Sequence, residues 1–79
     1  MEKTYIYNVL SSIFIDLLDD DSIQLNEHTT ANDIEGWDSL THIQLVVEIE
    51  QKLKLKFTSR EIQSWKNIGE LVTCILSKK

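Results

Sequence analysis

The hydrophobic positions in the first part of the chain recur at the spacing of an α-helix. Apolar residues three and four positions apart form one stripe: Ile6, Val9, Leu10, Ile13, Phe14, Leu17 and Leu18. This pattern predicts an amphipathic helix of about 15 residues that lies on a core. Asp19, Asp20 and Asp21 follow. We expect the helix to end there, because carboxylates oppose the macrodipole at a helix C-terminus.

Residues 19–37 lack this periodicity and are mostly polar and acidic. They predict a long connection in which Ile23, Leu25 and Ile34 point inward. Loops of this length are uncommon inside a small domain and usually have a function.

A second helix is expected to begin at Asp38 or Ser39 and to end at about Leu53. Asp38 is a good N-cap, since its carboxylate can accept a hydrogen bond from a backbone N–H of the first turn. The apolar arc expected to face the core consists of Ile43, Leu45, Val46, Ile49 and Leu53.

A capping box marks a third, short helix over residues 59–65. Thr58 and Glu61 have the spacing of the box, and Phe57 with Ile62 fits the accompanying hydrophobic staple.

Asn67 and Glu70 repeat the capping pattern and predict the start of a last helix. Its expected inner face is Ile68, Leu71, Val72, Ile75 and Leu76. The whole pattern predicts an all-α fold: a small four-helix bundle of three main helices and one short helix, with a long loop between the first and second helices. We expect residues 1–79 to form a single domain.

Length and composition exclude several classes of protein. A chain of 79 residues has room for one small core, so an enzyme with its own substrate cavity is not expected. The formal net charge of −5 disfavours binding to nucleic acid, which needs clustered cations. No apolar run reaches the ~20 residues of a membrane span, and no targeting segment is evident. We therefore expect a protein of the cytoplasm, and no heptad repeat or large apolar patch argues against a monomer.

Metal and disulfide chemistry are also not expected. Cys74 is the only cysteine, and His28 and His42 are the only histidines. One cysteine cannot form an internal disulfide, and these three residues are too few to predict a metal site.

Charge is segregated along the chain. Between Thr4 and Gln51 there are ten acidic residues and no Lys or Arg, whereas seven of the eight cations lie from Lys52 onward. The acidic half is predicted to dock against a basic partner surface. The alternative is that these charges form only a solvated surface.

The candidate chemistry lies in the segment Gly36-Trp37-Asp38-Ser39-Leu40. A serine after the N-cap lies in the first helical turn, where backbone N–H groups are unpaired and the dipole is positive. Such a position suits a phosphate ester. The alternative is that Ser39 only helps to start the helix, as serine often does.

The segment Gly36-x-Asp38-Ser39-Leu40 at the start of an apolar helix resembles the attachment motif of acyl carrier proteins. The resemblance extends over about residues 5–77 and includes the pattern Ile43-x-Leu45-Val46-x-x-x-Glu50. It implies a free-standing carrier and not an enzyme. A separate phosphopantetheinyl transferase, using coenzyme A and Mg²⁺, would attach 4′-phosphopantetheine to Ser39, flanked by Asp38 and Leu40.

The product of this modification would be a phosphoprotein whose thiol arm carries acyl groups as thioesters. Partner enzymes of fatty-acid, polyketide or another specialised biosynthesis, with basic docking surfaces, would load and unload it. The same resemblance implies a recognition face made of Leu40, Gln44 and Val47, which share one side of the helix. Trp37 is a further recognition candidate, since Trp is enriched at interface hot spots. The alternative for Leu40 and Val47 is burial in the core. Packing is the expected role of Trp65 and the alternative to recognition for Trp37.

The sequence departs from the pattern of fatty-acid carriers at several positions, and other functions stay open. Gln44, Gln51 and the lysines that follow stand where many fatty-acid carriers have acids, which disfavours a housekeeping role in fatty-acid synthesis. Thr41-His42 resembles a variant of specialised carriers, and His42 is expected to be a polar surface residue.

The cargo could instead be aminoacyl or peptidyl, for example D-alanyl. The domain could also be an interaction module without a prosthetic group. A serine hydrolase is the least favoured option, since the Gly-x-Ser-x-Gly elbow is absent.

Overall fold

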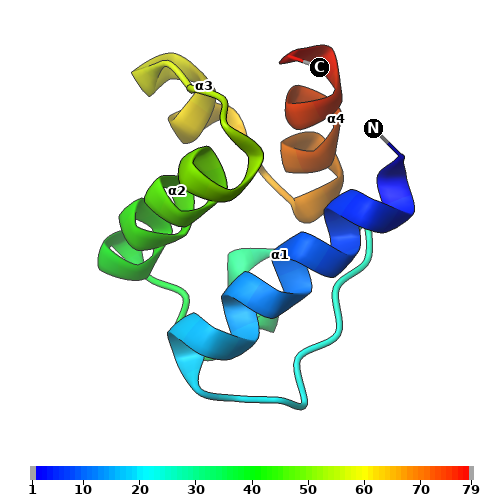
Figure 1. Cartoon of the computed structure of the whole chain (residues 1–79). Helices are drawn as coiled ribbons and strands as arrows, with labels where there is room; N and C mark the ends of the chain where they lie inside the picture. Colours follow the sequence, from blue (N-terminus) through cyan, green and yellow to red (C-terminus); the bar gives the residue numbers. More distant parts are fainter. Residues whose placement is uncertain (1, 79) are drawn as a thin grey trace.

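The computed structural model describes residues 2–78, and this part of the chain is helical without any strand. The elements are α1 (Lys3–Leu18), the 3₁₀ turn η1 (Ala31–Asp33), α2 (Ser39–Leu53), α3 (Ser59–Ser64) and α4 (Ile68–Lys78). The long loop starts at the end of α1 and comes back to that same end before α2 begins (Figure 1). The prediction of an all-α fold with three main helices and one short helix is confirmed.

The first helix buries the predicted stripe. Ile6, Leu10, Ile13 and Phe14 are almost completely excluded from solvent. The helix ends at Asp19, which adopts a left-handed conformation (φ 52°) and donates its N–H to the carbonyl of Ile15. The aspartate run therefore ends the helix as expected, with a left-handed C-cap as the local geometry.

The core is formed where α1 packs against both α2 and α4. Its buried members come from α1, the loop, α2 and α4, and they are Ile6, Leu10, Ile13, Phe14, Ile34, Leu45, Ile49, Leu53, Ile68, Leu71, Val72 and Ile75. The inner faces predicted for α1 and α4 thus lie in this core.

The long loop has its own anchors. Ile34 is buried, and Ile23 and Leu25 are half-buried against the core, as expected. The loop also contains the turn η1, which the sequence pattern did not predict. In this turn the Thr30 N–H donates to Asp33 Oδ2 at 2.9 Å, and the Asp33 N–H donates to the Thr30 carbonyl at 3.0 Å. These contacts hold the segment that leads into α2.

The expected core position of Ile43 is wrong, because its side chain is 54% exposed. The buried face of α2 consists of Leu45, Val46, Ile49 and Leu53. At about 100° per residue, Ile43 lies roughly 100° from the centre of this face. It therefore points past the edge of the core toward solvent.

Candidate functional site

Ser39 is the first residue of α2, and its side chain is exposed. A capping box fixes the backbone around it. The Thr41 N–H donates to Asp38 Oδ1 at 3.0 Å, and the Asp38 N–H donates to Thr41 Oγ1 at 2.7 Å. Within residues 2–78 the Ser39 hydroxyl makes no hydrogen bond, so a partner could reach it directly.

The Asp38 carboxylate is engaged in holding the helix start. The hydrogen bond from the Thr41 N–H keeps the pKa of Asp38 below its usual value. The predicted N-cap is therefore confirmed. A charged carboxylate also favours this end of the helix, where the macrodipole is positive.

Gly36 forms the turn that delivers the chain to α2. Its φ is +92°, a conformation that side-chain-bearing residues rarely adopt. A Cβ there would lie 3.3 Å from Leu18 Cδ2 at the end of α1. The Gly36 carbonyl accepts a hydrogen bond from the Thr41 hydroxyl at 2.9 Å. The glycine of the motif thus links the end of α1 to the first turn of α2.

A cleft of about 580 Å³ opens beside Ser39, between the start of α2 and α3. Apolar and aromatic side chains from both sides line it, among them Trp37, Ile43, Ile62 and Trp65. Ser59 and Lys66 also contribute. An exposed serine at a helix N-terminus beside an apolar cleft fits a phosphodiester that carries a flexible, partly apolar arm.

Aromatic rings form a continuous series that includes three side chains lining this cleft, those of Trp37, His42 and Trp65. Ring centroids are 5.0 Å apart for Phe14–Trp37, 5.9 Å for Trp37–His42, 5.8 Å for His42–Trp65 and 4.8 Å for Phe57–Trp65. Trp37 and Trp65 are both half-buried, which agrees with packing roles for the two tryptophans.

The expectation that His42 is simply a polar surface residue is wrong. Its ring is part-buried and hydrogen-bonded through both nitrogens, to the Trp37 indole and to the Ile62 carbonyl. Its neighbours are five and 20 positions away in the sequence. No local pattern around His42 reveals them.

The outer side of α2 presents the residues predicted for partner recognition. Leu40 is 68% exposed and Val47 is 45% exposed, and Gln44 between them is also exposed. Ile43 joins them, so Leu40, Ile43 and Val47 form what we call the α2 apolar row. The exposure of Ile43 differs from its expected core position, although its angular distance from the buried face of α2 was a usable signal.

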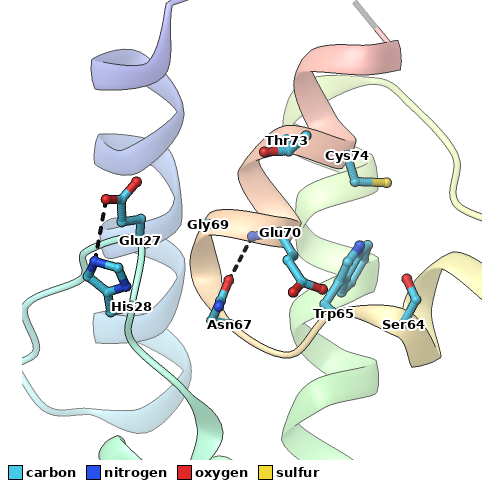
Figure 2. A pocket seen from close by; sticks show the side chains of 9 residues that line it. All are labelled: Glu27, His28, Ser64, Trp65, Asn67, Gly69, Glu70, Thr73 and Cys74. Atoms are coloured by element: carbon cyan, nitrogen blue, oxygen red, sulfur yellow. Dashed lines mark hydrogen bonds and ion pairs between the residues drawn. The ribbon is translucent and has the colours of Figure 1, made fainter.

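A second pocket, of about 540 Å³, shares Trp65 with the first and lies next to α4 and the loop residues Glu27 and His28 (Figure 2). Burial raises the pKa of the Cys74 thiol, whose Sγ lies 3.7 Å from Glu61 Oε2. A thiol held in its neutral form is a poor nucleophile. The raised pKa therefore disfavours Cys74 as a nucleophile for thioester chemistry.

Two further features of residues 2–78 bear on function. No group of three or more His, Cys, Asp or Glu side chains there could hold a metal ion. None of the helices in this range has both the length and the apolar character that crossing a bilayer requires.

Comparison with known proteins identifies the family. The sequence profile described as "Phosphopantetheine attachment site" matches residues 8–75. The fold is similar to the solution NMR structure of a holo acyl carrier protein from Geobacter metallireducens, with a TM-score of 0.84. The two chains are 44% identical over 91% of this chain and 83% of the other. A search of curated proteins gave no match.

The profile spans the loop, the Ser39 motif, α2, α3 and most of α1 and α4, and the solved structure has a similar fold. Members of this group are carriers, not enzymes, and their prosthetic group is phosphopantetheine. The resemblance noted in the sequence is thus confirmed, and the chain belongs to the acyl carrier protein family.

Proposed function

We propose that Ser39 carries 4′-phosphopantetheine and that the chain delivers acyl groups, as thioesters on this arm, to partner enzymes. One observation carries the proposal. In the segment that matches the attachment-site profile, Ser39 is an exposed serine on the first turn of a capped helix, beside an apolar cleft.

The chain's own residues prepare Ser39 for modification by a separate phosphopantetheinyl transferase. Ser39 Oγ forms an ester bond to the pantetheine-side phosphorus of coenzyme A, the nucleotide half leaves with the bridging oxygen, and the hydroxyl proton is released. Asp38 and Thr41 keep the first turn of α2 rigid during this step. The positive end of the helix favours the new phosphodiester charge.

The prosthetic group supplies a terminal thiol that forms thioesters with the cargo. A tethered cargo has a high effective concentration at each enzyme that the carrier contacts. This division of labour explains why a chain without a reactive cysteine of its own could still serve thioester chemistry.

Partner recognition is assigned to the outer side of α2. Leu40 and Val47 offer exposed apolar area next to Ser39, Gln44 lies between them, and Trp37 contributes the exposed part of its side chain. Ile43 extends this surface. Small apolar patches with a polar rim are typical of interaction sites. The acidic residues of the loop and α2 would complement a basic docking surface on the transferase and the acyl-transferring enzymes.

Such a carrier would act as a monomer in the cytoplasm, within a fatty-acid, polyketide or other specialised biosynthetic route. The proposal is tested by incubating the protein with coenzyme A, Mg²⁺ and a promiscuous phosphopantetheinyl transferase, followed by intact-mass measurement. The expected result is one added phosphopantetheine on the wild type and none on Ser39→Ala. An unmodified wild type with an intact helical fold would favour an interaction module without a prosthetic group.

A further inference from the structure

The His42 ring lies between two groups whose hydrogen-bonding roles are fixed. The Trp37 indole N–H donates to Nδ1 at 3.1 Å, and Nε2 lies 3.1 Å from the carbonyl oxygen of Ile62. An indole nitrogen can only donate and a carbonyl oxygen can only accept. Both bonds therefore form together only when His42 is neutral, with its proton on Nε2.

These bonds connect the Ser39 end of α2 to α3. His42 lies in the first turn of α2 and Trp37 in the turn before α2, whereas Ile62 lies in α3. The helix α3 has only six residues and no fully buried side chain. Polar and aromatic contacts therefore contribute to its position, among them those of His42 and the ion pair between Glu61 and Lys78.

Ring packing reinforces the connection. The His42 ring stacks on Trp37 with an interplanar angle of 20°, and its edge contacts Trp65 just after α3. His42, Ile62 and Trp65 all line the cleft beside Ser39. The imidazole ring thus contacts both the turn before Ser39 and the α3 wall of the cleft.

We propose that His42 is a positioning residue whose neutral form holds α3 against the Ser39 end of α2, and whose protonation releases it and widens the cleft. A proton on Nδ1 would bring two N–H donors against each other at the Trp37 contact. The ring must then turn away from Trp37, which moves Nε2 away from the Ile62 carbonyl. The inference concerns the unmodified chain and stands whether or not Ser39 carries a prosthetic group.

Few other charged groups share the surroundings of His42. Asp38, before α2, and Lys66, after α3, line the same cleft. On α3, Glu61 is engaged with Thr58 and Lys78, and Arg60 is exposed. The only other histidine, His28, is exposed in the loop beside Glu27. A change between pH 8 and pH 5, where imidazole side chains titrate, therefore tests His42 with His28 as a matched control.

The experiment is NMR spectroscopy of the full-length unmodified chain between pH 8 and pH 5. It follows the protection factor of the Trp37 indole N–H, which is its exchange rate relative to the intrinsic rate at the same pH. The protection factors of the α3 amides are measured in parallel. We expect both to fall roughly fivefold or more toward pH 5, as the loss of one hydrogen bond would produce. The His28→Gln variant should show the same profile.

The His42→Gln variant should have protection factors that do not change with pH. A wild-type profile that is flat from pH 8 to pH 5, or an unchanged fall in His42→Gln, would overturn the proposal. Nitrogen chemical shifts of the His42 ring in the wild type give a test that needs no variant. Near pH 8 they should show the Nε2–H tautomer, and a proton on Nδ1 would contradict the proposed connection.

Discussion

The backbone N–H of Gly69 donates a hydrogen bond to the carbonyl oxygen of Glu27, 3.0 Å away, where the long loop meets the start of α4. The Ile68 N–H donates in the same way to the Thr29 carbonyl at 2.8 Å. The first N–H groups of a helix have no partner within the helix, so the loop carbonyls cap α4. The loop is thereby fixed to α4 before it continues to the Ser39 motif.

This contact leaves no room for a side chain at position 69. A Cβ there would lie 2.8 Å from the Glu27 oxygen and 3.0 Å from the Glu27 Cβ. Gly69→Ala should therefore lower the free energy of unfolding by about 1–3 kcal/mol, even though alanine favours helices. Urea unfolding followed by circular dichroism measures the change. Thr73→Ala, at an exposed position of α4, is the control and should be close to neutral. Equal stability of the two variants would contradict the close contact.

The carboxylate of Glu61 should make stability depend on pH in the acid range. The Thr58 N–H and then the Lys78 ammonium, 2.9 Å from Oε1, lower the pKa of Glu61 to about 2. A group whose folded-state pKa is depressed stabilises the fold above its unfolded-state pKa. That contribution is lost as the pH falls from about 4.5 toward 2.

Glu61→Gln keeps a side-chain oxygen that can accept from Thr58 but removes the titrating charge. Between pH 5 and pH 2 the urea midpoint of the wild type should therefore fall more steeply than that of Glu61→Gln. Parallel curves for the two proteins would show that the Glu61 contacts contribute nothing to acid stability.

Leu40 should be needed for partner recognition but not for folding. Because its side chain is 68% exposed, Leu40→Asp should retain the helical circular dichroism spectrum and change unfolding by at most ~0.5 kcal/mol. The rate of phosphopantetheine transfer should fall about tenfold, the effect of losing one interface hot spot. Leu45→Asp, at a fully buried position, should instead unfold the protein. Loss of the fold in Leu40→Asp would make Leu40 a structural residue.

The charge layout predicts that docking depends on salt. Ten acidic residues and no Lys or Arg lie between Thr4 and Gln51, the part of the chain that contains Ser39. If these acids guide the approach of a basic transferase, the transfer rate should fall steadily as salt rises to about 0.5 M, because screening shortens the range of the attraction. Initial rates at subsaturating carrier concentration measure this effect. A flat profile would exclude electrostatic guidance.

The sequence predicted most of this fold because its signals are local. The apolar stripe of α1 and the capping patterns of Asp38 and Thr58 each depend on residues within one or two helical turns. The same locality explains why the position of Ser39, at the start of α2, followed from the sequence.

The features that the sequence did not reveal depend on contacts between distant segments. His42 bonds to Ile62 in α3, and Gly69 bonds to Glu27 in the loop. Neither pair has a spacing that a periodic pattern can show. Ile43 is a different case, since its exposure follows from its angle on α2 once the four buried positions of that helix are known.

The most direct measurement for the proposed carrier function is peptide mapping of the protein after treatment with transferase, coenzyme A and Mg²⁺. Ser59 provides a stringent comparison. It is exposed, follows the N-cap Thr58 at the start of α3 and lines the same cleft as Ser39. The account predicts one phosphopantetheine on the peptide that contains Ser39, full modification of Ser59→Ala and none of Ser39→Ala. Modification at Ser59, or modification that persists in Ser39→Ala, would contradict it.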